Sequence, residues 1–217
     1  LSLRELSIIR EALDSRDLTA ETDFALAPVP TETSDFASHH FSASGPSHIA
    51  DQVHRYPFAF RHVTNEDWRP DFVPGERQRF IWYVFPDDYF GVKETDYARH
   101  VVQPVERILK AVLGDLELVR PLVITADHGY IWQGNQCPWP VADPQQRAVL
   151  AKHFKLGRSC HDATDALATT GKVWAQGSAA AARGRFAWGG QVRGATSLFK
   201  HGGVSLMECL VPWMTVG

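Results

Sequence analysis

The sequence is poor in cysteine, has no long apolar run and lacks acidic residues over one extended stretch. Only 3 of its 217 residues are cysteines, an odd number without the spacing of metal-binding pairs, which indicates reduced thiols in a cytoplasmic protein. No apolar run approaches the ~20 residues that span a bilayer. Arg4, Glu5 and Arg10 interrupt the apolar segment that a signal peptide needs. These absences exclude a disulfide-stabilised secreted scaffold and predict a protein without a membrane segment.

Acidic residues are missing from positions 166–207, although the whole chain carries a net charge of -3. This stretch instead holds basic residues: Lys172, Arg183, Arg185, Arg193 and Lys200. One interpretation is a solvated basic loop region, and the other is an electropositive lip above a site for anions such as phosphate esters. The charge count alone does not choose between them.

Apolar patterning predicts the fold class. Residues 80–85 and 121–126 are short, nearly continuous apolar runs typical of buried strands, and another such run closes the chain at 210–216. Residues 3–13 and 101–113 repeat apolar positions with helical spacing. Alternating strands and helices are typical of an α/β domain with a mainly parallel central sheet and helices on both faces.

Two stretches interrupt this pattern. Residues 44–79 are rich in proline and glycine, and residues 137–195 show no clear periodicity. At 217 residues the chain is long enough for one domain that buries roughly 70% of its unfolded surface. We therefore expect one domain over residues 1–217, with irregular cap insertions at these two places.

The strand at 121–126 ends in Asp127, His128 and Gly129. A carboxylate and an imidazole suit zinc or manganese, and the glycine permits a tight turn that aims both side chains at one point. In parallel sheets the carboxyl end of a strand is also where ligands bind. The alternative is a capped turn without a metal, and the motif alone leaves both open.

Two further motifs carry possible chemistry. Residues 30–35 (PTETSD) have the Ser, Thr and Asp content of a helix N-terminus, where a threonine hydroxyl lies close to groups that favour phosphate and a developing alkoxide. A simple helix cap explains the same residues. The other motif, residues 201–203 (HGG), places a histidine before a flexible turn and the last strand. This histidine is either a metal ligand or an ordinary loop residue.

Four segments together form a recognisable series: PTETSDFASHHFSASG, FPDD after a strand, TADHG and KHGGVSLMECLVPW. In order and spacing they resemble the PglZ domain, a branch of the alkaline phosphatase superfamily. The HGG-x-S-L-x-E-x-x-V-P pattern is the more specific part, and TADHG is shared more widely. The resemblance covers most of the chain and is weakest in the two cap insertions. Such domains occur in phage-defence systems of the BREX type and in some bacterial signalling proteins.

The resemblance implies roles for individual residues. Thr33 corresponds to the nucleophile, Asp127 and His128 to the ligands of one divalent metal, and His201 to a ligand of a second. The acid that follows the strand at 80–85 would assist the second metal; Asp87 is the first choice and Asp88 the next. The implied cofactors are two zinc ions, with manganese as the alternative. Basic residues would hold the remaining phosphoryl oxygens, and the candidates are Arg193 and Lys200.

The chain departs from the superfamily pattern in two respects. The usual D-x-x-x-H histidine is missing, since Gly91 is the fourth residue after Asp87, although Asp96 and His100 show that spacing further along. The metal-binding aspartate of a first core strand is also missing, because the chain opens on a predicted helix. We therefore expect a C-terminal portion of a longer protein, with an unfilled strand position near Thr33 and Asp127 and weakened metal binding.

The functional expectation is a metal-dependent phosphodiesterase or phosphatase of a phage-defence system, acting on a phosphate ester, with nucleic acid or nucleotides as candidate substrates. Other defence-system proteins are the expected partners. The alternative is a catalytically degenerate PglZ domain that serves as an interaction module, which the missing histidine favours. The remaining histidines are expected to be bystanders without partners at ligand spacing: His39, His40, His48, His54, His62, His153 and His161.

Overall fold

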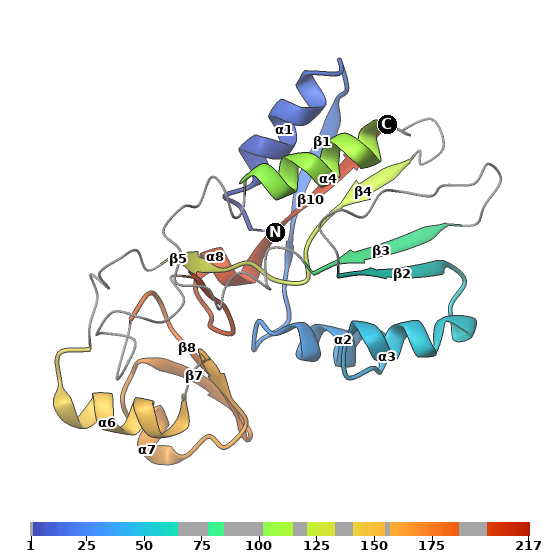
Figure 1. The fold of residues 1–217 in the computed structure, drawn as a ribbon. Helices are drawn as coiled ribbons and strands as arrows, with labels where there is room; N and C mark the ends of the chain where they lie inside the picture. Colours follow the sequence, from blue (N-terminus) through green and yellow to red (C-terminus); the bar gives the residue numbers. More distant parts are fainter. Residues whose placement is uncertain are drawn as a thin grey trace.

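The computed structural model describes residues 2–64, 78–84, 102–114, 121–132, 141–154, 157–186 and 199–217. Figure 1 shows three groups of elements: an upper helix-and-sheet layer, a second layer of strands and helices, and a small unit set to one side. The candidate site residues lie where these groups meet.

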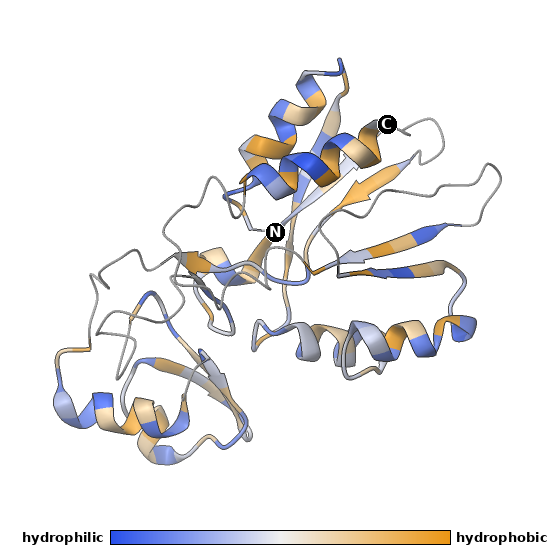
Figure 2. Ribbon diagram, viewed as in Figure 1, coloured by the Kyte–Doolittle hydropathy of each residue, from blue (hydrophilic) through white to orange (hydrophobic). Residues whose placement is uncertain are grey.

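The upper layer packs two helices on a three-stranded sheet (Figure 1). Its elements are α1 (Leu6–Asp14), β1 (Ala20–Leu26), α4 (Gln103–Gly114), β4 (Leu122–Ile124) and β10 (Leu210–Val216). Apolar residues at helical spacing, such as Ile9 and Leu13 of α1 and Leu109 of α4, form one buried cluster with Met214 and Val216 of β10. Both helices carry hydrophobic and hydrophilic positions in Figure 2, as expected for helices that bury one face.

The strand directions in this layer overturn the predicted parallel sheet. Strand β10 lies between β1 and β4 and is antiparallel to both. Among the described strands only β2 and β3 pair in parallel, so the prediction of a mainly parallel central sheet is wrong. The cause is the C-terminal segment: most of β10 is buried, and a buried strand has the same continuous apolar pattern whichever way it runs.

Helices on both faces of this sheet were also expected, and the described part differs. The described helices that join the buried cluster of this layer, α1 and α4, both lie on one side of it in Figure 1. Val123 and Trp213 on its strands remain more than two-fifths exposed. Among the described residues, the sheet is therefore covered mainly on one face.

The second layer supports the segment that carries Thr33. It consists of α2 (Thr33–Phe41), α3 (Pro46–Asp51), the 3-10 turn η1 (Val53–Arg55), β2 (Ala59–Val63) and β3 (Arg79–Tyr83). Ala37, Ile49 and Trp82 are buried together, with further aromatic rings packed around them. Among its described residues, the stretch expected as a cap insertion at 44–79 contains α3, η1 and β2, and β2 pairs with β3 over its whole length.

The small unit occupies much of the stretch at 137–195. It contains α6 (Pro144–His153), β6 (Ser159–Cys160), α7 (Asp165–Ala168), β7 (Val173–Gln176) and β8 (Ala179–Ala182). Its strands form an antiparallel sheet in the order β6-β8-β7. Asp143 caps α6 by accepting hydrogen bonds from the first-turn backbone, and Leu150, Phe154 and Leu167 fill a core of its own. This unit is therefore an ordered helix-and-sheet module.

Three short elements connect the groups: β5 (Ile131–Trp132), β9 (Phe199–Lys200) and α8 (Leu206–Cys209). Strands β5 and β9 pair antiparallel, which brings the segment after Asp127 beside the segment before His201. Within the described ranges, no helix combines the length and the apolar content required to cross a membrane.

Candidate functional site

Thr33 is the first residue of α2, where backbone N–H groups of the first helical turn have no partner within the helix. Its hydroxyl lies 2.7 Å from Oδ2 of Asp127 and 3.1 Å from Nε2 of His128. Asp127 and His128 follow strand β4, so the contact joins two segments about 95 positions apart in the sequence. The threonine and the Asp-His pair therefore form one cluster.

The Thr33 hydroxyl carries one proton, whereas two acceptor groups lie within reach of it. Donation to Asp127 leaves His128 Nε2 facing the same oxygen, and His128 Nδ1 lies 3.1 Å from the carbonyl of Gly129, to which it donates. A neutral imidazole that donates from Nδ1 has only a lone pair on Nε2. A divalent cation placed among these atoms would accept the lone pairs of the carboxylate, the hydroxyl and Nε2 together.

Asp127 keeps its charge in this setting. Burial raises the pKa of its carboxyl, but the nearby His128 and the hydrogen bond from Thr33 outweigh that effect and hold the pKa below its ordinary value. A carboxylate that remains ionised beside a histidine and a hydroxyl is suited to bind a divalent cation or to accept the hydroxyl proton.

His201 joins the cluster from the other side. Its ring stacks on that of His128 with centroids 4.5 Å apart and an interplanar angle of 16°. Nδ1 of His201 lies 3.1 Å from a carboxylate oxygen of Glu32, the residue directly before α2. When Nδ1 donates its proton to a carboxylate, the lone pair is on Nε2, which is the usual arrangement of a metal-binding histidine.

Glu32 is held in place by partners on both of its oxygens. Ser159 of the small unit donates a hydrogen bond of 2.5 Å to Oε1, while His201 contacts Oε2. Burial raises the pKa of Glu32, but His201, through its hydrogen bond and charge, and Ser159 together lower it below the ordinary value. Glu32 is therefore a carboxylate at neutral pH and orients the His201 ring.

The two glycines after His201 are required by close contacts. Gly202 has a φ of +95°, and a Cβ there would collide with the carboxylate of Glu32. A Cβ on Gly203 would collide with the carboxylate of Glu208 and with the Ala182 carbonyl. The glycines thus let the backbone approach two carboxylates, and this explains the HGG sequence in physical terms.

Thr31 and Glu208 fix this turn by hydrogen bonds. The Thr31 hydroxyl accepts from the backbone N–H of Gly202 at 2.9 Å and donates to the carbonyl of Gly203 at 2.9 Å. Glu208 accepts from the backbone N–H groups of Gly203 and Ser205, at 2.9 and 3.1 Å. The turn that follows His201 is consequently held by four hydrogen bonds to the side chains of Thr31 and Glu208.

Glu208 is itself paired with Arg158 of the small unit. Nε of Arg158 lies 2.7 Å from Oε1 of Glu208, and both side chains are 0% exposed. The guanidinium also donates to the carbonyls of Phe186, at 3.1 Å, and Gly184. Glu208 therefore links the turn after His201 to the small unit through a buried ion pair with Arg158.

Gly129 has a similar packing role. Its backbone N–H donates to the carbonyl of Glu208 at 2.8 Å, and a Cβ at this position would collide with the carbonyl of Met207. Any larger residue would push the Asp127-His128 segment away from α8. The glycine thus brings the two metal-competent motifs side by side.

The other predicted site residues are placed as follows. Lys200 lies on β9, opposite Ile131 of β5, and burial together with the neighbouring Arg158 lowers its pKa. Asp87, Asp88 and Arg193 lie outside the described residues, as do Asp96 and His100. The described part of the predicted site is thus Thr33, Asp127, His128 and His201, with Lys200 next to His201 in the chain.

The remaining histidines differ among themselves. His48 contacts Ser44 and Gln52, and His39 and His40 pack against each other on α2. His153 departs from the expectation that it lacks a partner at ligand spacing, since it lies beside Cys160 and Asp162.

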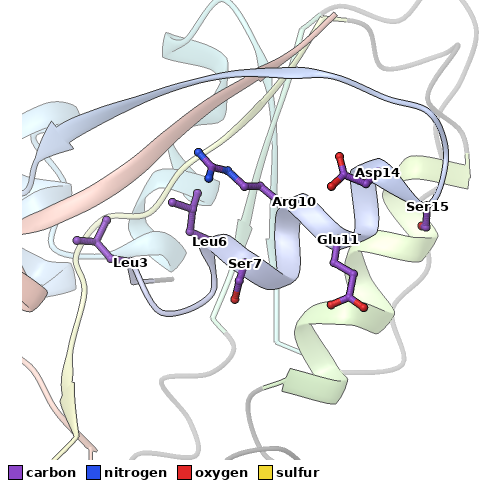
Figure 3. A pocket seen from close by; sticks show the side chains of 7 residues that line it. All are labelled: Leu3, Leu6, Ser7, Arg10, Glu11, Asp14 and Ser15. Atoms are coloured by element: carbon purple, nitrogen blue, oxygen red, sulfur yellow. The ribbon is translucent and has the colours of Figure 1, made fainter.

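A surface hollow of about 670 Å³ runs along α1 and is lined by side chains such as Arg10, Glu11 and Asp14 (Figure 3). None of the four clustered site residues lines it. It is separate from the cluster around Thr33.

Sequence patterns did not reveal the supporting residues Glu32, Ser159 and Arg158, because their partners are far away in the chain. Glu208 had a local signal: Ser205 followed three residues later by glutamate is the pattern of a capping box, and Glu208 accepts from the backbone N–H of Ser205 as that pattern predicts. With this geometry in place, comparison with family models and with curated proteins finds no match for the chain.

Proposed function

We propose that the chain is a metal-dependent phosphoesterase of the PglZ type, with Thr33 as the nucleophile. The observation that carries the proposal is the convergence of the Thr33 hydroxyl with the Asp127 carboxylate and two imidazoles. A nucleophile beside ionised and imidazole groups, at a helix N-terminus, is suited to attack phosphorus.

The donor set fits a divalent cation. The three distances among Thr33 Oγ1, Asp127 Oδ2 and His128 Nε2 are 2.7, 3.1 and 3.6 Å. Ligand atoms at ~2.0–2.1 Å around tetrahedral zinc lie about 3.3 Å from one another, which these distances bracket. Asp127, His128 and Thr33 would hold one ion, and His201 would contribute to a second. When bound, such ions supply a Lewis acid that activates the nucleophile and stabilises negative charge on the phosphoryl group.

The residues of the chain then have distinct tasks. Asp127, which already accepts a hydrogen bond from the Thr33 hydroxyl, would take its proton as the oxygen attacks phosphorus. The alcohol of the ester leaves from the opposite side and takes up a proton from water. The product of this step is a phosphothreonine at position 33, which water hydrolyses. The N-terminus of α2 favours the phosphoryl oxygens next to Thr33. Glu32 keeps His201 in the orientation that the site requires.

The proposed substrate class is a phosphate ester, with nucleic acid or nucleotides as candidates in a cytoplasmic phage-defence setting. Lys200 and Arg193 are the proposed contacts to non-bridging oxygens. Other proteins of the defence system are the proposed partners.

The test is hydrolysis of bis-p-nitrophenyl phosphate and p-nitrophenyl phosphate with added zinc or manganese. Thr33→Ala is expected to lower the rate on the order of 10³-fold or more, because the nucleophile is lost. Ser34→Ala is the matched control, since it removes an exposed hydroxyl one position away. Metal-stimulated hydrolysis that survives Thr33→Ala would overturn the proposed nucleophile.

A second candidate is a degenerate PglZ domain that acts as an interaction module. The observation in its favour is apolar exposure on paired strands: Phe24 is 48% exposed, Leu26 77% and Trp213 44%. Large exposed apolar groups on neighbouring strands are typical of contact surfaces. Absence of hydrolysis with either metal, together with retained folding, would favour this function.

A further inference from the structure

A second group of metal-competent side chains lies in the small unit, away from Thr33. His153 ends α6, Cys160 ends β6, and Asp162 follows two residues later. One donor atom from each residue lies within 4.8 Å of the other two. The His153 and Cys160 residues are largely buried, with exposed fractions of about 8%, whereas the Asp162 side chain is 69% exposed.

The geometry of the histidine and the carboxylate points toward a shared third atom. Nδ1 of His153 lies 3.2 Å from Oδ2 of Asp162, close to the ~3.3 Å between neighbouring ligand atoms on tetrahedral zinc. Nδ1 is nevertheless buried and forms no hydrogen bond of acceptable geometry. The two groups thus form a close ion pair without a well-directed hydrogen bond, and a cation bound by both atoms would satisfy them.

The surroundings also favour a cation. His153 is the last residue of a ten-residue helix, whose C-terminal end carries partial negative charge from its carbonyl groups. Asp162 adds a carboxylate oxygen 3.2 Å from Nδ1 of His153. A positive ion at this point would interact favourably with the helix, the carboxylate and the sulfur.

We propose that His153, Cys160 and Asp162 form a site for zinc or a similar transition-metal ion. Nitrogen, sulfur and oxygen ligands select such ions over magnesium and calcium, which prefer oxygen alone. Three protein ligands leave a fourth position, and the exposed Asp162 puts this position next to solvent. The site therefore binds an exchangeable ion with one water ligand.

A catalytic thiol is the competing explanation for a Cys-His-Asp group, and the structure disfavours it. In a catalytic group of this kind the histidine lies between the thiol and the acid, whereas here Asp162 contacts both the thiol and the imidazole. A bound transition-metal ion deprotonates a coordinating thiol, so Cys160 would bind it as the thiolate.

Cobalt titration of the full chain tests the site, because thiolate coordination to cobalt produces a charge-transfer absorption in the near ultraviolet. We expect this absorption to saturate at one ion per chain and to disappear in Cys160→Ser. It should persist in Cys209→Ser, the matched control, since Cys209 is the other described free cysteine. His161→Ala, an exposed neighbour, should also leave it unchanged.

Asp162→Asn guards against a folding artefact, because this exposed side chain can change without disturbing the core. It should weaken cobalt affinity about tenfold or more while circular dichroism and melting in chelator stay the same. The proposal is overturned by an absent absorption, or by one that Cys160→Ser retains. Thr33→Ala should keep the absorption, since the Thr33 cluster contains no sulfur, so the outcome is independent of the proposed phosphoesterase activity.

Discussion

Replacing Glu208 with glutamine should cause a large loss of stability, because it removes the carboxylate that pairs with the buried Arg158 guanidinium. Both side chains are 0% exposed, and Nε and Oε1 are 2.7 Å apart. Two unit charges about 4 Å apart attract by about 4 kcal/mol at an effective dielectric constant of about 20. Measured losses on breaking buried pairs are about 3–5 kcal/mol. We therefore expect Glu208→Gln to lower the free energy of unfolding by about 3–5 kcal/mol.

Urea unfolding followed by tryptophan fluorescence measures this change. Glu11→Gln is the matched control, since it removes an exposed carboxylate from α1 and should change stability by no more than about 0.5 kcal/mol. The double variant Arg158→Met, Glu208→Gln removes both charges while keeping an acceptor for the Gly203 and Ser205 backbone, and it should be less destabilised than Glu208→Gln alone. If Glu208→Gln loses less than about 1 kcal/mol, the ion pair does not support the turn at 202–203 in the way described.

Two further predictions concern the same turn. Gly202→Ala should destabilise the protein and weaken zinc binding in calorimetry, because the φ of +95° at Gly202 and the nearby Glu32 carboxylate exclude a Cβ. Gly171→Ala is the control for positive φ alone, since the space around its Cβ position is open. Unchanged zinc binding in Gly202→Ala would contradict this account. In chelator, stability should be highest above the ordinary glutamate pKa of 4.5 and fall as pH drops through the lowered pKa of folded Glu32. Glu32→Gln should flatten this acid limb in urea titrations, and an equally steep limb would refute the assignment.

The sequence predicted elements better than their pairing. Apolar spacing located the helix around Ile9 and the strands at 80–85 and 210–216, because burial of one face or of a whole strand leaves a local pattern. Strand direction leaves no such pattern. The central position of β10 depends on contacts with β1 and β4 that are far away in the chain, so the sheet was predicted parallel and is antiparallel.

The candidate site shows the same division. Thr33, Asp127, His128 and His201 stood out because a reactive or metal-competent side chain occurs next to a helix start, a strand end or a glycine turn. Glu32 was visible in the same segment, but its task depends on His201 and Ser159, which only the folded chain brings near. Residues that orient others through distant contacts are therefore the part that a single sequence conceals.

The small unit contacts the segments around His201 and Glu32, and these contacts limit how the chain can be shortened. Ala182 accepts a hydrogen bond from the backbone of Val204 at 2.8 Å, Ser159 binds Glu32, and Arg158 binds Glu208. Deleting this unit would remove the Ser159 hydroxyl, the Arg158 guanidinium and the Ala182 carbonyl, which all bind the segments around His201. A shortened form of this chain would need substitutes for all three, placed within about 3 Å of their present partners.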